Sequence, residues 1–323
     1  MTPLPDDARA AARRAGRGAA MLALAAWALI VVGALVRAHG AGLSCPDWPL
    51  CQGQLVPSFD ARIALEWGHR LLAGSLSLGA AALAFALLRR RPLRARFARS
   101  LVLVFALLGV QVTLGGLTVL LGLAPWTVTA HLLTGNAFAL ALAWLARDLL
   151  DAAHGETRAP AKLPPGGARL VAVVSFLVAL QVVLGGLVSS HSAGLACATF
   201  PLCNGDSVAP TLQGPVGLHV LHRLNAYGVT AAFALLAWQL RAAGSSGRLA
   251  WTGLRLVLLQ IAVGAANVLL RLPVEVTALH SALAAGIFLT TGLLARDALT
   301  AARATQKNVA TAAHERHALG GAQ

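Results

Sequence analysis

Charged residues are scarce in this chain, and their scarcity excludes a soluble enzyme. Asp, Glu, Lys and Arg make up 12% of the 323 residues, about half of the roughly 25% that is usual in a soluble domain. Hydrophobic residues make up 57%, and the mean hydropathy is +0.71. The apolar runs reach about 20 residues, the length that an α-helix needs to cross a bilayer. The composition therefore predicts a polytopic protein embedded in the lipid bilayer.

The hydrophobic pattern also lacks the alternation of polar and apolar residues that marks a membrane strand. Because backbone polar groups must pair with one another inside lipid, continuous apolar runs predict helices. The predicted fold class is all-α, with eight transmembrane helices at about 19–38, 66–88, 100–122, 126–147, 169–190, 217–240, 251–271 and 275–296.

Acidic residues are few: 12 Asp and Glu stand against 26 Lys and Arg, for a net charge of +14. Such a basic chain could bind nucleic acid, but its basic residues gather in the loops on one side of the predicted helices, which is the signature of cytoplasmic loops. We therefore predict no nucleic-acid partner, a bacterial inner membrane, both termini in the cytoplasm, and long outer loops at about 39–65 and 191–216. The first apolar run is too long for a cleavable signal peptide and is interpreted as a membrane helix.

The chain also contains an internal duplication. AHGAGLSCPDWPLC from Ala38 resembles SHSAGLACATFPLC from Ser190, and HRL at 69–71 recurs at 222–224. Each repeat has an even number of helices, so the repeats are expected to run parallel, related by a pseudo-two-fold axis along the membrane normal. The predicted division is a cytoplasmic tail at 1–18, a first four-helix half at 19–147, a cytoplasmic linker at 148–168, a second four-helix half at 169–296 and a cytoplasmic tail at 297–323.

Four histidines lie inside the predicted helices, at His69, His131, His222 and His280. At about 1.5 Å per residue, all four lie roughly 5–8 Å below the outer surface. One imidazole from each of two helices at a common depth is the arrangement of a haem with two axial histidines. The alternative is four polar core histidines that bond to neighbouring helices. Duplication and matched depth favour haem ligation, and the shortage of nearby Cys or carboxylate ligands disfavours zinc.

Three ionisable residues open the second predicted helix in the segment Glu66-Trp67-Gly68-His69-Arg70. Intramembrane ionisable groups mark function by default. Glu66 lies three residues before His69, on the same helix face, and could donate or accept protons beside a haem. Its counterpart is His219, interpreted as a polar residue at the surface level, with ligation as the alternative. A lone carboxylate in two similar halves predicts one reacting site and one supporting site.

Two further pairs of residues have open roles. Arg70 and Arg223 each follow a histidine directly; they could bind haem propionates, or extend towards lipid headgroups. The cysteines form two C-x5-C pairs in the outer loops, predicting the disulfides Cys45–Cys51 and Cys197–Cys203. Each disulfide could be a loop staple worth about 2 kcal/mol, or a redox-active pair that exchanges with an outside partner.

Together, the EWGHR segment, the second HR pair, the single histidines at 131 and 280, QVTLGGLTV at 111–119, GLSCPDWPLC at 42–51 and the duplication resemble the haem A synthase family. The likeness extends over about residues 20–298, to the subfamily with cysteine pairs in both long outer loops. It implies an oxidoreductase that oxidises the C8 methyl group of haem O to a formyl group by successive hydroxylation, giving haem A for cytochrome oxidase assembly.

The resemblance also implies roles for the individual residues. His222 and His280 would hold the iron of a haem b cofactor, His69 and His131 would bind the substrate haem O, and Glu66 would be catalytic. Haem O synthase is an implied partner. No quinone or flavin motif identifies the electron donor. Two alternatives remain open: a bis-histidine membrane cytochrome that only relays electrons, and a membrane thiol-disulfide oxidoreductase.

Overall fold

The protein is an all-helical bundle in a computed structural model that describes residues 4–155, 163–205 and 207–320. All eight long helices are long and apolar enough to cross a membrane, which confirms the predicted fold class and the multi-pass character. A short 3-10 helix, η1 (Ala193–Leu195), follows α5. The long helices are α1 (Asp6–Ala38), α2 (Ala61–Leu88), α3 (Arg91–Leu120), α4 (Pro125–Ala153), α5 (Gly167–Ser190), α6 (Gly214–Gln239), α7 (Gly244–Leu269) and α8 (Val274–Gly320).

Several helices extend beyond their predicted ends on the side of the chain termini. α1 begins at Asp6 rather than residue 19, and α8 continues past residue 296. Hydropathy detects only the apolar part of a helix, whereas the Ala- and Arg-rich segments beyond it have high helix propensity. α3 and α7 end two residues earlier than predicted because Gly122 and Arg271 adopt left-handed backbone angles, with φ of 59° and 62°.

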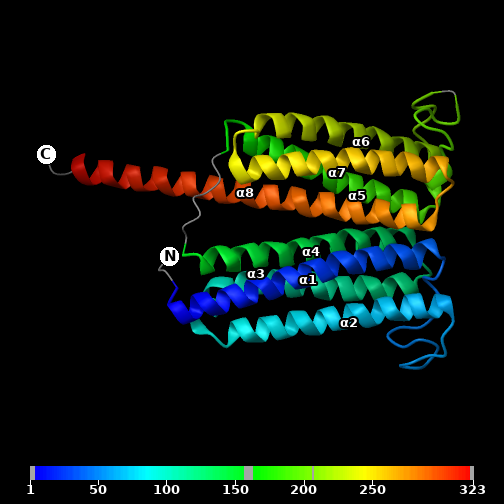
Figure 1. The fold of residues 1–323 in the computed structure, drawn as a ribbon, viewed down its shortest axis with the longest axis horizontal. Coiled ribbons are helices and arrows are strands. Elements are labelled where there is room, and N and C mark those ends of the chain that lie inside the picture. Colours follow the sequence, from blue (N-terminus) through cyan, green and yellow to red (C-terminus); the bar gives the residue numbers. More distant parts are fainter. Residues whose placement is uncertain (1–3, 156–162, 206, 321–323) are drawn as a thin grey trace.

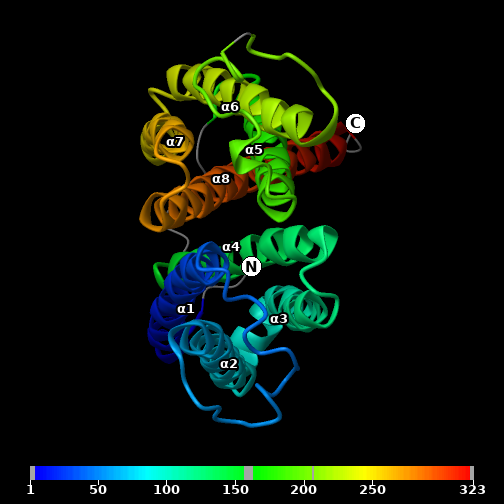
Figure 2. The same ribbon diagram turned by 90° about the vertical axis from the view of Figure 1, so that its right-hand side faces the viewer.

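The helices form two groups, α1–α4 and α5–α8, as Figure 1 shows. Seen from the end in Figure 2, α1, α4, α5 and α8 occupy the middle, while α2 and α3 lie on one side and α6 and α7 on the other. α8 contacts both α1 and α4, and α4 also contacts α5. The two long loops that follow α1 and α5 lie at one end of the bundle, and the described chain ends lie towards the other.

Polar contacts join the two groups at several levels. Trp27 and Trp144 donate through Nε1 to the carbonyls of Ala282 and Gly292, at 3.0 and 2.8 Å. Beside the long loops, the Arg37 guanidinium donates to Ser189 Oγ at 2.6 Å. These bonds span the middle and one end of the interface between the groups.

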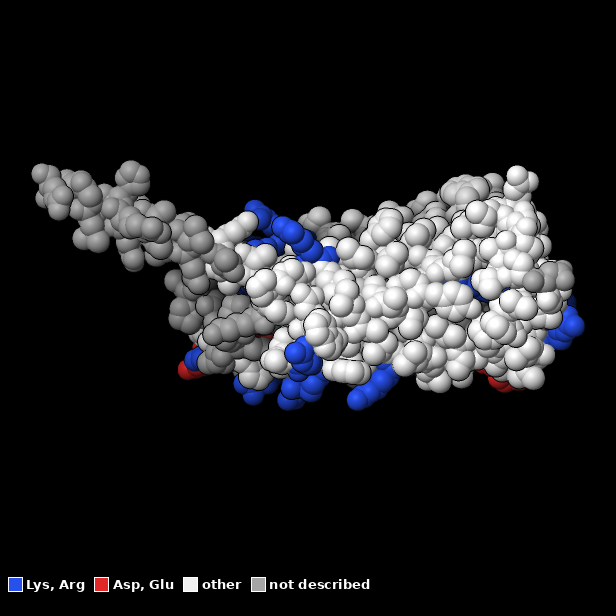
Figure 3. All heavy atoms as spheres, turned by 90° about the horizontal axis from the view of Figure 1, so that it is seen from above, with Lys and Arg blue, Asp and Glu red and all other residues white. Residues whose placement is uncertain are grey.

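Near the chain termini, Arg296 on α8 bridges two carboxylates of α4. Its guanidinium lies 2.6 Å from Asp148 Oδ1 and 2.6 Å from Asp151 Oδ2. The partly buried Arg296 thus links the last helix of the second group to the last helix of the first. Residues 156–162 of the predicted linker lie outside the described residues. Seen from above in Figure 3, Lys and Arg side chains gather mainly towards the end that carries the chain termini.

Candidate functional site

Each of the four predicted ligand histidines lies on an even-numbered helix. In the second group, His222 on α6 and His280 on α8 face each other, with ring centroids 6.5 Å apart and an interplanar angle of 54°. Two imidazoles that bind one metal ion through bonds of about 2 Å have centroids about 6 Å apart. The second pair therefore has the spacing of two axial ligands on one iron. In the first group, His69 lies on α2 and His131 on α4.

A glycine on the preceding helix makes room for each imidazole. A Cβ built on Gly33 would lie 3.1 Å from His69 Cε1, which is closer than ordinary van der Waals contact. The same close approach, at 3.1–3.2 Å, occurs at all four histidines. The pairs are Gly33–His69 (α1–α2), Gly115–His131 (α3–α4), Gly185–His222 (α5–α6) and Gly264–His280 (α7–α8). Each of the four rings thus packs in the same way against a glycine of the neighbouring helix.

Three of the four histidines have a buried ring nitrogen that could bind an additional group. The Nδ1 atoms of His69, His131 and His280 are buried without a hydrogen-bond partner, which is uncommon for buried polar atoms. Within the described ranges, no three His, Cys, Asp or Glu side chains gather in a metal-binding cluster. Haem suits such pairs, because the porphyrin supplies the other ligands of its iron and the protein supplies the axial ones.

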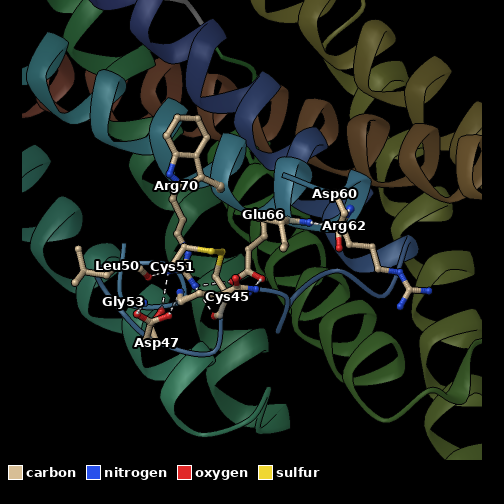
Figure 4. The surroundings of a disulfide bond; sticks show 12 residues. Cys45, Asp47, Leu50, Cys51, Gly53, Asp60, Arg62, Glu66 and Arg70 are labelled. Carbon is tan, nitrogen blue, oxygen red and sulfur yellow. Dashed lines mark hydrogen bonds and ion pairs between the residues drawn. A yellow bond between two sulfur atoms is a disulfide. The ribbon is translucent and has the colours of Figure 1, made fainter. Parts of the chain in front are cut away.

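Glu66 is buried, with 4% of its surface exposed, and lies beneath the first outer loop. Its Oε1 accepts a hydrogen bond from Arg70 at 2.6 Å, and its Oε2 accepts one from the backbone N–H of Cys45 at 2.9 Å. Figure 4 shows Glu66 and Arg70 pointing from α2 towards this disulfide loop. Oε2 therefore ties α2 directly to the outer loop, while Oε1 pairs with Arg70 on the same helix.

His219 occupies the matching place in the second half and is buried rather than exposed at the surface. The backbone N–H of Cys197 donates to His219 Nδ1 at 3.3 Å, as the N–H of Cys45 does to Glu66. His219 is 5% exposed. The two positions make the same loop contact, but only the first contributes a carboxylate.

Arg70 and Arg223 both hold an outer loop to the helix below it. Arg70 donates to the carbonyls of Asp47, Leu50 and Cys45 at 2.8, 2.6 and 2.9 Å. Arg223 donates to Cys197 O at 2.9 Å and to Leu202 O at 3.5 Å. Sequence reasoning missed these contacts, because backbone carbonyls of a distant loop leave no local signal.

Both predicted disulfides are present, Cys45–Cys51 and Cys197–Cys203, each with a Cα–Cα distance of 4.6 Å. All four cysteines are buried within their loops. The first loop is further closed by Asp47, whose carboxylate accepts from Gln52 N at 2.6 Å and Gly53 N at 2.8 Å. The Gly53 bond is the main cause that holds the pKa of Asp47 below its ordinary value.

Comparison with known proteins places this site in a family. Residues 18–291 match the family model COX15-CtaA, described as cytochrome oxidase assembly protein. The heme A synthase of Shewanella oneidensis is 29% identical over 305 residues, covering 81% of this chain and 90% of that protein. The heme A synthases of Halalkalibacterium halodurans and Symbiobacterium thermophilum are 30% and 31% identical, covering 81% and 80% of this chain and 89% and 87% of theirs. The chain therefore belongs to the COX15-CtaA family of cytochrome oxidase assembly proteins.

Proposed function

We propose that this chain is a haem A synthase, a membrane oxidoreductase that converts haem O to haem A for cytochrome oxidase. The observation that carries the proposal is the family match over residues 18–291, with relatives of that name along about four fifths of the chain. The paired histidines supply the means to hold two haems. The reaction is the oxidation of the C8 methyl group of haem O to a formyl group, through successive hydroxylations and loss of water.

The two histidine pairs are assigned different tasks. His222 and His280, whose ring spacing suits one iron, hold a haem b cofactor. A bound haem b would supply one-electron redox chemistry. His69 and His131 bind and orient the substrate haem O, because the carboxylate of Glu66 lies on the helix of His69 and the second half has no counterpart.

Glu66 is proposed to hold and move a proton at the reacting half. Its burial and its ion pair with Arg70 keep the carboxylate in one place, which general acid–base catalysis requires. The hydrogen bond to Cys45 N leaves the same oxygen able to accept a proton on its second lone pair. Arg70 thereby acts as the counter-charge of the proposed catalytic group.

Arg70 and Arg223 remain candidates for haem propionate contacts. The four terminal N–H groups of Arg70 already face three carbonyls and Glu66, so a propionate there would take Nε or replace a carbonyl. Arg223 makes fewer loop contacts and has more capacity for a propionate.

The proposed setting is a bacterial inner membrane, with both termini and the linker in the cytoplasm. The gathering of Lys and Arg at the end that carries the termini supports this orientation. The division into tails, two halves and a linker, as well as partnership with haem O synthase, are part of the same proposal. The burial of all four cysteines disfavours thiol exchange as the main activity.

The test is conversion of haem O to haem A in membranes that contain haem O and lack other sources of haem A. Membranes with the wild-type chain should yield a formyl-bearing haem on extraction, and a His69→Ala variant should leave haem O unconverted. A chain that binds haem yet never forms haem A would instead support an electron-relay cytochrome. A purified chain without any haem absorption would contradict both haem functions.

A further inference from the structure

Two linked side-chain amides lie between α5 and α6, and one of them contacts His222. Gln181 Nε2 on α5 donates to the backbone carbonyl of His222 at 3.1 Å and lies 3.2 and 3.4 Å from the ring atoms Nδ1 and Nε2 of His222. Asn225, three residues after His222, donates through Nδ2 to Gln181 Oε1 at 2.7 Å and to Leu177 O at 3.0 Å. The amide of Gln181 is thus held at one end by Asn225 and faces His222 with the other.

The first half has no counterpart of this amide pair. The offset of 152 between Gly33 and Gly185 places Leu29 at the position of Gln181. The offset of 153 between His69 and His222 places Leu72 at the position of Asn225. Both replacements are apolar, and neither can make a side-chain hydrogen bond.

The surroundings of His69 are consistent with the apolar residues at these two positions. Leu29 packs against the hydrophobic core of the first half, and Leu72 is 50% exposed on the outside of α2. His69 Nδ1 is buried without a hydrogen-bond partner. His69 and His222 therefore both pack against a glycine, but only His222 also has a side-chain amide beside it.

The other histidine of each pair does not show this contrast. Gln111 Nε2 lies 3.3 Å from His131 Nε2 in the first half, and Gln260 Nε2 donates to His280 O at 3.0 Å in the second. A glutamine therefore stands beside the second histidine in both halves. The presence of an amide beside the histidine therefore distinguishes the helix pair α5–α6 from the helix pair α1–α2.

We propose that Gln181, oriented by Asn225, is a positioning residue that makes His222 a permanent haem ligand, and that Leu29 leaves His69 an exchangeable one. The bond from Gln181 to the His222 carbonyl holds the backbone that carries the ligand ring, and losing an outer-shell hydrogen bond of a ligand costs about 10–100-fold in affinity or activity. The inference rests on the proposed function, in which the second half keeps its haem while the first must take in haem O and release haem A. Two differences at equivalent positions, Leu29 against Gln181 and Leu72 against Asn225, separate these two demands.

The direct test measures haem release from the second pair alone. Full-length protein carrying His69→Ala and His131→Ala is loaded with haem b and mixed with excess apomyoglobin as the haem acceptor. Adding Gln181→Met, which keeps an unbranched side chain but no amide, should speed release about 10–100-fold. The electron paramagnetic resonance spectrum of the ferric haem should also change, because the backbone that carries the imidazole is no longer held by the amide.

Two further variants on the same helices complete the test. Asn225→Leu should act in the same direction more weakly, since Gln181 keeps its bond to His222 O. Ser175→Ala on α5, which removes only a bond to Val171 O of its own helix, should leave release and spectrum unchanged. A Gln181→Met protein that runs as folded in size-exclusion chromatography, with release within twofold of its parent and an unchanged spectrum, would overturn the proposal.

The reverse exchange tests the other half. With His222→Ala and His280→Ala confining haem to the first pair, adding Leu29→Gln and Leu72→Asn should slow release; unchanged or faster release would count against the inference. Failure of the proposed function would look different. In that case, protein with an intact second pair would bind no haem b before any amide is changed.

Discussion

α2 and α6 carry equivalent histidines against equivalent glycines, yet the residues around those histidines differ. Near His69, the carboxylate of Glu66 contacts the outer loop, and the position equivalent to Gln181 holds the apolar Leu29. Near His222, His219 makes the loop contact and an amide network holds the ligand. The shared framework supports the proposal that each half holds a haem. The differences indicate where each half departs from the other in chemistry.

The largest expected effect separates the two histidine pairs. His222→Ala should remove the resident haem b, because the remaining imidazole cannot provide both axial ligands. His69→Ala should leave haem b in place while abolishing conversion of haem O. The check is the haem extracted from each purified variant. Retention of haem b in His222→Ala together with its loss from His69→Ala would mean that the halves are assigned in reverse.

The two loop-holding arginines should differ in their contribution to stability. Arg70→Ala leaves the buried Glu66 carboxylate without its cation, a change that typically costs about 3–5 kcal/mol. Arg223→Ala removes hydrogen bonds to two carbonyls and leaves no buried charge unpaired, which costs about 1–3 kcal/mol. Thermal unfolding in detergent should therefore give the lower melting temperature for Arg70→Ala. An equal drop in melting temperature for both variants would contradict the expected contribution of the ion pair between Glu66 and Arg70.

The glycine contacts of the histidine rings should respond to a single added methyl group. Gly185→Ala brings a Cβ to 3.2 Å from His222 Cε1, so the ring must shift. Overpacking of this kind costs about 1–3 kcal/mol. Absorption spectra should show altered or partial haem b in Gly185→Ala, and Gly33→Ala should lower conversion while haem b stays normal. Gly228→Ala on α6, where nothing lies within 4 Å of the added atom, is the matched control.

The smallest expected effect is a difference between the two outer loops in their response to acidification. Asp47 accepts from Gly53 N, and Thr199 makes the equivalent bond from Gly205 N with a neutral hydroxyl. Because the pKa of Asp47 is lowered in the folded protein, its contribution is complete above the unfolded pKa of about 3.9 and is lost as the pH falls through the folded value. Hydrogen exchange, corrected for intrinsic rates, should accelerate at Gly53 on acidification but not at Gly205. Equal acceleration in both loops would contradict this reading.

The eight helices were predictable because each apolar run must form its own backbone hydrogen bonds in lipid. The first and last residues of the helices were harder to predict, because the Ala- and Arg-rich start of α1 is helical without being apolar. The turn at Gly122 also depends on a backbone angle that hydropathy does not report. The predicted pseudo-two-fold relation of the halves stays a prediction.

The histidines could be found from sequence because ionisable residues stand out in apolar helices. Gly33 and Gly185 could not, since a glycine gains its role only from the ring opposite on the next helix; the repeat offset was the available signal. Gln181 can be recognised in the sequence as a polar residue within an apolar run. Its proposed importance, however, depends on the contrast with Leu29.

The central claim is that the half with the carboxylate is the reacting half. Its most direct measurement compares Glu66→Gln with His219→Gln, which alter the same loop contact in the two halves. Loss of a general acid–base group typically costs about 10²–10⁴ in rate. We predict that Glu66→Gln keeps its haem b but slows conversion of haem O at least about a hundredfold, while His219→Gln stays close to wild type. Equal activity in both variants would contradict the account.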